Sequence, residues 1–143
     1  MAAAKMSVAE LEQFLRDEFP QAFSGDDITI ESADGQTCLL RQRYGEKMLR
    51  PGGTVSGPTL MALADFAMYV VLLSAIGPIG LAVTTNLNIN FLRKPRLGAL
   101  IAECHLLKLG QRLAVGQVTI CADGDDEPVA HATSTYSIPP RAK

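Results

Sequence analysis

The chain has 143 residues, of which 48% are hydrophobic and 20% are charged, and its formal net charge is −2. This length and composition predict a single globular domain over residues 1–143, long enough to bury one sizeable core. The slightly negative charge argues against general nucleic-acid binding, which needs a basic surface. The lack of Trp and the aromatic content of 6% argue against a surface on which bases stack.

The cysteines and the N-terminus favour a cytoplasmic protein. Cys38, Cys104 and Cys121 are odd in number, and their spacing is not that of a metal site. Each lies in an apolar or strand-like run, so we expect buried free thiols in a reducing compartment. The first ten residues show no apolar segment of the secretory kind. We expect no metal and no separate cofactor.

The chain begins with a short helix. Residues 1–6 are expected to be flexible. Ser7 and Glu10 then have the spacing of a capping box, and apolar residues recur at helical intervals as far as Phe19. Pro20 ends the pattern, so we predict an amphipathic helix over residues 7–19. We expect it to pack on the main body and to carry no catalytic residue.

Two strands and a loop follow. Residues 28–33 and 37–44 have the composition of strands, and Asp34 and Gly35 between them are typical of a tight hairpin turn. Residues 45–57 read as a loop, marked by Pro51, Gly52 and Gly53.

A long apolar helix is predicted next. Ser56, Gly57 and Pro58 suit its start, and Gly77 ends it after about residue 76. It is apolar on nearly every side, which indicates a helix buried in the core rather than one on the surface. It has the length of a membrane span, but Asp65 near its centre and the strand-rich remainder argue against one. Asp65 is either paired in the core or used in chemistry, since a buried lone charge is costly.

Four strands complete the predicted fold, over residues 81–92, 99–109, 112–122 and 129–138. Their short connections favour antiparallel pairing. We therefore predict an α+β fold: one curved antiparallel sheet of about six strands wrapped around the long helix, with an extra N-terminal helix. Strict alternation in the strand over residues 81–92 would place Thr84 on the same face as Asn86, Asn88 and Asn90. That face lines either a substrate channel, a dimer contact or solvent.

Other polar residues allow two interpretations each. Arg93, Lys94 and Arg96 form the densest basic cluster, which either contacts the phosphates of a ligand or is a solvated turn. His105 and His131 lie within strands, where a lone His is more often a surface or core residue than a catalytic one.

A segment from Gly53 to Asp65, which reads GTVSGPTLMALAD, carries a family resemblance. Together with the later run Asn90 to Pro95, which reads NFLRKP, it resembles the hot-dog fold thioesterases. The similarity is greatest to the PaaI-like acyl-CoA thioesterases of the phenylacetate-degradation type, and it covers roughly residues 45–138. The resemblance implies a homodimer or a dimer of dimers (a homotetramer), with each active site built from two subunits.

The resemblance also implies roles for individual residues. Asp65 would be the catalytic base or nucleophile, the Gly57 backbone amide the oxyanion donor, and Thr84, or Thr85 next to it, the assisting hydroxyl. Asp65 of one chain would face Gly57 of the other. The family usually has His-Gly-Gly at the helix start, where this chain has Ser56-Gly57-Pro58. The expected substrate-binding residues are Ser56, Pro58, Asn86, Arg93, Lys94 and Arg96.

The leading functional hypothesis is therefore an acyl-CoA thioesterase, which hydrolyses the thioester to a free acid and coenzyme A. Acyl-CoA is the expected small-molecule partner. The alternative is a non-catalytic hot-dog protein that binds acyl-CoA or a related ligand. A dehydratase or hydratase on the same fold is less consistent with the sequence, because no His precedes or lies on the long helix.

Overall fold

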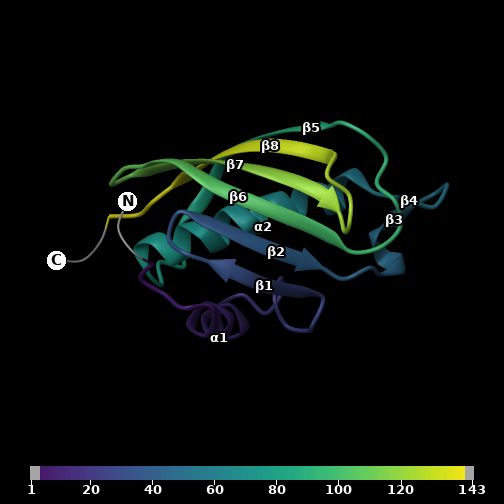
Figure 1. Cartoon of the computed structure of the whole chain (residues 1–143). Coiled ribbons are helices and arrows are strands. Elements are labelled where there is room, and N and C mark those ends of the chain that lie inside the picture. The colour runs from purple at the N-terminus through teal and green to yellow at the C-terminus, as the bar shows by residue number, and fades with distance from the viewer. Residues whose placement is uncertain (1–3, 141–143) are drawn as a thin grey trace.

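The long helix α2, Gly57–Ile76, lies inside a curved six-stranded sheet in the computed structural model, which describes residues 4–140 (Figure 1). The sheet strands are β1 (Ile28–Ala33), β2 (Thr37–Gln42), β5 (Val83–Phe91), β6 (Leu100–Leu109), β7 (Leu113–Ala122) and β8 (Pro128–Ser137). All pairings in it are antiparallel. This arrangement confirms the fold predicted from the sequence.

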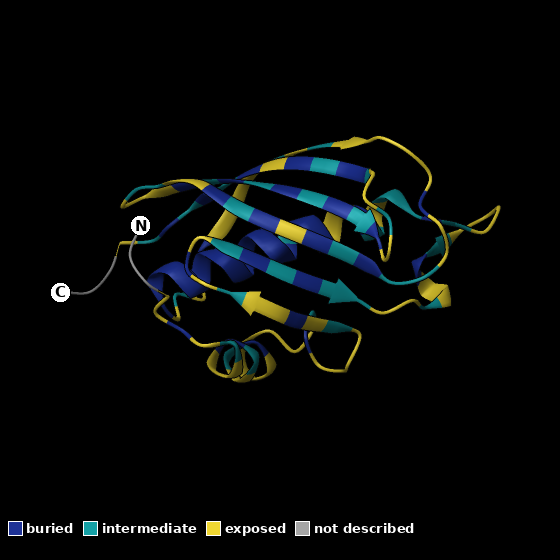
Figure 2. Cartoon of the chain, viewed as in Figure 1, coloured by how far each residue is buried: buried dark blue, intermediate teal, exposed yellow. Residues whose placement is uncertain are grey.

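Local sequence signals set both ends of α2. The Ser56 side chain caps the first turn by accepting a hydrogen bond from the Thr59 N–H, and Pro58 lies in that turn, where its missing N–H would have no partner in the helix. Gly77 ends the helix with a φ of 98°, a conformation that favours glycine. By length and composition α2 could cross a membrane, but 78% of its most apolar window is buried inside the protein (Figure 2). It is a core helix.

The strand order in the sheet is β1-β2-β6-β7-β8-β5. β5 therefore pairs with β8 and not with β6, although short consecutive connections favour neighbours. The chain from β5 to β6 instead passes the ends of β8 and β7 (Figure 1). As a result β5 lies at an edge of the sheet, and it is mostly exposed (Figure 2).

A β-bulge interrupts β5. Thr84 pairs with Tyr136 and Asn86 pairs with Thr135, so Thr85 is an extra residue in the strand. Such a bulge reverses the side-chain alternation beyond it. Thr84 thus faces α2 together with Leu87 and Ile89, which pack against the core. The expectation that Thr84 shares a face with Asn86, Asn88 and Asn90 is wrong for this reason.

The N-terminal helix α1, Val8–Glu18, has the predicted capping box between Ser7 and Glu10. The chain is fixed before that point, because the Lys5 N–H donates to the Ser74 carbonyl and Met6 is buried in the core. The expected flexibility of residues 1–6 therefore does not extend to these two residues, and residues 1–3 lie outside the described part of the chain.

The loop before α2 has structure that the sequence did not predict. A short 3-10 helix, η1 (Glu46–Met48), is followed by a two-stranded hairpin of β3 (Leu49–Arg50) and β4 (Thr54–Val55). This hairpin extends from the sheet at one end of the molecule (Figure 1). It places the Ser56 N–H against the Met48 carbonyl and so fixes the start of α2.

The cysteines are free, as expected. Cys38 and Cys104 are buried opposite one another on β2 and β6, and the Cys38 thiol donates to the Ala67 carbonyl of α2. The neighbouring Cys104 and burial raise the pKa of Cys38, so this thiol stays protonated. Cys121 is only half-buried.

Candidate active site

Asp65 lies where α2, β5 and β8 meet. Its Oδ1 accepts a hydrogen bond from the Thr84 hydroxyl at 2.6 Å and another from the Tyr136 hydroxyl at 3.1 Å. The Tyr136 hydroxyl also lies 3.2 Å from the Asp65 carbonyl oxygen. The carboxylate is therefore held in one orientation by two donors from different strands.

The other carboxylate oxygen, Oδ2, has no hydrogen bond to the described residues. Asp65, Thr84 and Tyr136 line a groove of about 660 Å³, a volume within the range of about 300–1,000 Å³ that is typical of small-molecule sites. Asp65 itself is half-buried. One oxygen is thus fixed while the other is available to a water molecule or a substrate in the groove.

Of the two threonines that the sequence left open, Thr84 contacts Asp65. The Thr85 hydroxyl donates instead to the Thr135 carbonyl, at 3.2 Å. The bulge separates these roles, because the two residues point in different directions within the strand.

Tyr136 is a site residue that the sequence analysis missed. It lies 71 residues from Asp65, within a strand whose pattern explains it as a core aromatic. Burial above all, with a contribution from the Asp65 charge, raises the pKa of Tyr136 well above its ordinary value. The hydroxyl therefore remains a hydrogen-bond donor across the neutral and moderately alkaline range.

Gly57 lines a different groove, of about 520 Å³, at the N-terminus of α2. As the first helical residue, its N–H has no partner within the helix and points along the positive end of the helix dipole. The Phe91 ring lies over it, since a Cβ at this position would be 3.3 Å from Phe91 Cζ. Gly57 and Asp65 are eight residues apart, which places them about 12 Å apart along the helix axis. One chain cannot hold a single thioester carbonyl against both.

Ser56 and Pro58 have structural roles at the helix start. The Ser56 hydroxyl accepts from the Thr59 N–H and lies 2.8 Å from the Thr59 hydroxyl, so its hydrogen-bonding capacity is largely used within the first turn. Pro58 is exposed and lines the Gly57 groove. Of the two, Pro58 is the one placed to contact a ligand.

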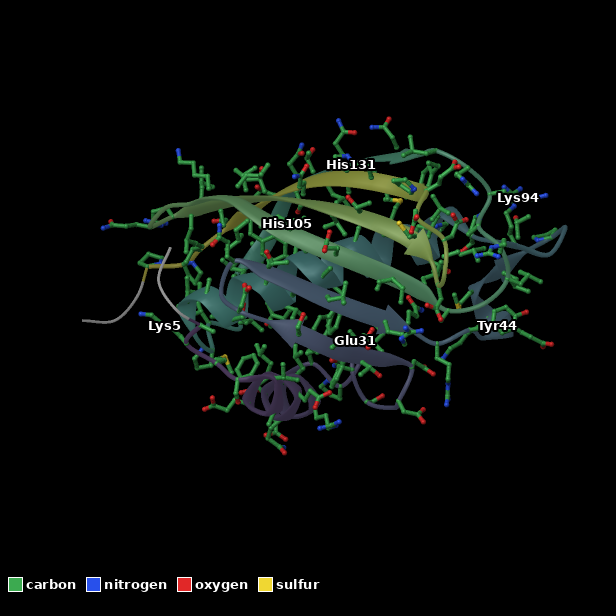
Figure 3. The ribbon with its side chains drawn as sticks, viewed as in Figure 1. Lys5, Glu31, Tyr44, Lys94, His105 and His131 are labelled. Atoms are coloured by element: carbon green, nitrogen blue, oxygen red, sulfur yellow. The ribbon has the colours of Figure 1, made fainter. Side chains whose placement is uncertain are left out.

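The basic cluster divides into paired and unpaired residues. Arg93 forms ion pairs with Asp125, at 3.1 Å, and with Glu127. Arg96 lies 4.0 Å from Asp125 and outside the Gly57 groove. Lys94 lines that groove and forms no ion pair with the described residues, and Figure 3 shows it at the end of the molecule that carries the β3–β4 hairpin. Lys94 is therefore the member of the cluster best placed to meet an anionic ligand.

Arg50, in the β3–β4 hairpin, also lines the Gly57 groove, beside Arg93 and Lys94, and was not expected from the sequence. It forms no ion pair with the described residues. Its place could not be found from the sequence, because it depends on the unpredicted hairpin.

Asn86, His105 and His131 lie away from both grooves. Asn86 follows the bulge on the face that does not meet α2. His105 bonds Thr37 and Glu103, and His131 bonds Gln117. Within residues 4–140, no group of His, Cys, Asp and Glu side chains is arranged to hold a metal ion.

Two adjacent surfaces near Asp65 are exposed. One is the stripe of α2 formed by the exposed residues Pro58, Met61 and Ala62, which share one face of the helix with the half-buried Asp65. The other is the edge of β5, where Val83 and Phe91 are each more than half exposed. These are apolar or unpaired surfaces next to the candidate catalytic residue.

A model of the thioesterase superfamily matches residues 52–129, which is more than half of the chain and includes α2, β5, β6 and β7. The chain belongs to the thioesterase superfamily. A crystal structure from Silicibacter sp. TM1040, named a "putative thioesterase", is 42% identical to it, with a TM-score of 0.87 over 96% of this chain and 94% of that one.

Two further proteins show the extent of the similarity. A curated protein of Saccharolobus solfataricus, named a "putative esterase", is 28% identical over 93% of this chain and 86% of its own length. A "hypothetical thioesterase" of Streptococcus pneumoniae, crystallised with coenzyme A, is 21% identical and has a TM-score of 0.76 over 93% of this chain and 99% of that one. These thioesterase-superfamily structures confirm the hot-dog fold. The PaaI-like subgroup stays a prediction.

Proposed function

We propose that this thioesterase-superfamily protein is an acyl-CoA thioesterase that hydrolyses its substrate to a free acid and coenzyme A. The observation that carries the proposal is the Asp65 carboxylate, fixed by Thr84 and Tyr136 with Oδ2 open to a groove. The family match and the names of the relatives support the same reaction class.

Hydrolysis of a thioester needs few catalytic groups beyond Asp65, Thr84 and Tyr136. Asp65 either removes a proton from a water molecule as that water attacks the thioester carbonyl, or attacks the carbonyl itself. In the second case the thiolate is expelled and a mixed anhydride forms on Asp65, which a water molecule then hydrolyses to release the free acid and the carboxylate. The departing thiol, like that of cysteine with its ordinary pKa of about 8.5, is far more acidic than an alcohol, so it leaves as a thiolate without a strong acid catalyst. Thr84 and Tyr136 hold Oδ1, which directs Oδ2 at the reacting atoms.

The oxyanion site requires a second copy of the chain. Because Gly57 and Asp65 lie about 12 Å apart along one helix, we propose that the Gly57 N–H of a second copy polarises the carbonyl that Asp65 attacks. The exposed edge of β5 and the exposed stripe of α2 support this homodimer, since joining two β5 edges would bury both surfaces.

Coenzyme A is the proposed thiol for two reasons. The Gly57 groove holds two cations, Arg50 and Lys94, that are free of ion pairs with the described residues and could bind phosphates. The related structure from Streptococcus pneumoniae contains coenzyme A. Buried thiols are suited to a reducing compartment, so we also propose a cytoplasmic location.

A second candidate function is binding of acyl-CoA without hydrolysis. It is favoured by the helix start, where Pro58 has no N–H to offer an oxyanion and Ser56 is engaged with Thr59. In this case the thioester would bind and remain intact.

Hydrolysis of a panel of acyl-CoA thioesters distinguishes these functions. We expect the wild type to release coenzyme A and Asp65→Asn to lose at least about 100-fold in kcat, as is typical of a general base or nucleophile. Asp126→Asn, an exposed acid outside the Asp65 groove, is the matched control and should retain full activity. Tight binding of an intact thioester by the wild type would favour the second function, and full activity of Asp65→Asn would overturn the proposed mechanism.

A further inference from the structure

The groove that holds Asp65 continues onto the N-terminal helix. Phe14, Glu18 and Phe19, from α1 and its end, line the same groove as Asp65 and Tyr136. From the sequence, α1 was not expected to carry a catalytic residue. We propose that this extension holds the acyl group of the substrate, and that Glu18 selects for acyl groups that carry no negative charge at their far end. The proposal rests on the proposed thioesterase function.

A row of aromatic rings leads from the carboxylate toward α1. The Tyr69 ring stacks at 6.1 Å from the ring of Tyr136, which donates to Asp65, and the Phe19 ring meets Tyr69 edge-on at 5.9 Å. Pro78 and Leu81 add further apolar surface to the groove. A thioester carbonyl placed at Asp65 would therefore have a continuous apolar surface along which its acyl group can lie.

The wall formed by α1 is held in place. The Phe14 ring packs against Gly80 so closely that a Cβ there would lie 3.2 Å from Phe14 Cζ. The Tyr69 hydroxyl donates to the Gly80 carbonyl at 3.1 Å. Both α1 and α2 are thus anchored on the same loop, so the groove exists before a ligand enters.

The charged side chains that line the groove are acidic. Its only charged lining residues among those described are Asp65 and Glu18, and no Lys, Arg or His lines it. Glu18 forms no ion pair with the described residues. Burial, and after it the Glu18 charge, raises the pKa of Tyr69, which lines the same groove. A carboxylate at the far end of an acyl chain would meet repulsion there and find no cation to pair with.

The test compares two thioesters of equal length, octanoyl-CoA and the mono-CoA thioester of octanedioic acid. The wild type should prefer octanoyl-CoA in kcat/KM. We expect Glu18→Gln to raise the diacid-to-octanoyl ratio about fivefold, as expected for one partly screened charge, and Glu18→Lys to raise it further. Glu12→Lys, on the same helix but outside the groove, is the matched control and should leave the ratio unchanged.

The aromatic surface is tested separately with Phe19→Leu and Phe19→Ala. We expect kcat/KM for octanoyl-CoA to fall stepwise relative to that for acetyl-CoA, whose short acyl group does not reach α1. The milder variant guards against loss of folding, since Phe19 also packs against Phe66.

The outcomes separate the two proposals. An unchanged diacid-to-octanoyl ratio in both Glu18 variants of an active enzyme would overturn the inference while leaving the thioesterase function intact. Hydrolysis of acetyl-CoA but not of octanoyl-CoA by the wild type would likewise overturn the inference and leave the thioesterase function intact. If the wild type hydrolysed none of the thioesters, by contrast, the thioesterase function itself would be contradicted.

Discussion

The Tyr136 hydroxyl donates to Asp65 Oδ1 at 3.1 Å, and it also lies 3.2 Å from the carbonyl oxygen of the same residue. The strand β8 therefore fixes both the side chain and the backbone of α2 at the candidate catalytic residue. The Thr84 hydroxyl completes the arrangement from β5. Because the donors come from two strands, the position of Asp65 depends on how the sheet packs on the helix.

Tyr136→Phe should lower kcat with little change in KM. The substitution removes the donor and keeps the ring, and a hydrogen bond to a charged group contributes about 1.5–3 kcal/mol, which corresponds to about 10- to 100-fold in rate if it acts fully in the transition state. Steady-state kinetics with the best acyl-CoA substrate provides the measurement. Tyr44→Phe, at an exposed loop position, is the control. A wild-type kcat in Tyr136→Phe would show that Tyr136 does not position Asp65.

Stability should decrease above about pH 10, the ordinary pKa of tyrosine, because the folded state raises the pKa of Tyr136 chiefly by burial. In that range the unfolded tyrosine loses its proton while the folded one keeps it. The contribution of Tyr136 to the free energy of unfolding is therefore fully present below about pH 10, and it is lost as the pH rises toward the pKa of Tyr136 in the folded state. Urea unfolding at several alkaline pH values measures it, and Tyr136→Phe should show a weaker pH dependence than the wild type. If the free energy of unfolding fell equally steeply with pH in the wild type and in Tyr136→Phe, this prediction would be contradicted.

Thr84→Val and Thr84→Ser should differ. Valine has nearly the same shape but no hydroxyl, so it removes the 2.6 Å bond to Asp65 and should lower kcat about 10-fold or more. Serine keeps the hydroxyl and should retain most of the activity. Thr85→Val and Thr85→Ser should have little effect on kcat, because the Thr85 hydroxyl donates to the Thr135 carbonyl and not to Asp65. If the Thr85 variants lose activity and the Thr84 variants do not, the assignment of the assisting hydroxyl is reversed.

Mixed dimers can show whether one active site uses residues from two chains. Asp65→Asn and Gly57→Val should each be inactive, since the second adds side-chain bulk beside the Phe91 ring. Mixed and reassembled in equal amounts, they should recover about a quarter of wild-type activity, because half of the dimers are mixed and each has one intact site. No recovery in dimers shown to be mixed, for example by two different affinity tags, would mean that both residues act within one chain.

Lys94→Gln should raise KM for acyl-CoA with little change in kcat. Lys94 lines the Gly57 groove and has no ion pair with the described residues, so its charge is available to a phosphate. The effect should disappear for an acyl thioester of N-acetylcysteamine, which lacks the phosphates of coenzyme A. Lys47→Gln, at an exposed residue that pairs with Asp27 and does not line this groove, is the control. An equal rise in KM for both thioesters would argue against phosphate contact.

Arg93 provides a useful contrast with Lys94. Its ion pairs with Asp125 and Glu127 tie the loop that follows β5 to the turn between β7 and β8. The sequence grouped Arg93, Lys94 and Arg96 by proximity in the chain, whereas the structure separates them by partner. Proximity along the chain could not reveal this, because the acidic partners lie more than thirty positions away.

Local signals in the sequence determined most of the secondary structure of this protein. The capping box of Ser7 and Glu10, the Ser56 cap and the stop at Gly77 act within a few residues, so they mark the helices without knowledge of the rest. Apolar patterning alone showed that α2 is buried and that Asp65 within it needs a partner or a use. The roles of Asp65, Gly57 and Thr84 came from the family resemblance rather than from the pattern.

The tertiary structure alone decided how these residues meet. Tyr136 reaches Asp65 across 71 positions, and the bulge turns Thr84 toward α2 while directing Asn86 away. The position of β5 at the sheet edge and the contribution of α1 to the groove likewise depend on long-range packing. The pattern of a strand indicates which of its side chains are buried, but not which strand pairs with it. The pairing of β5 with β8 is what brings the Thr84 and Tyr136 hydroxyls to the same carboxylate.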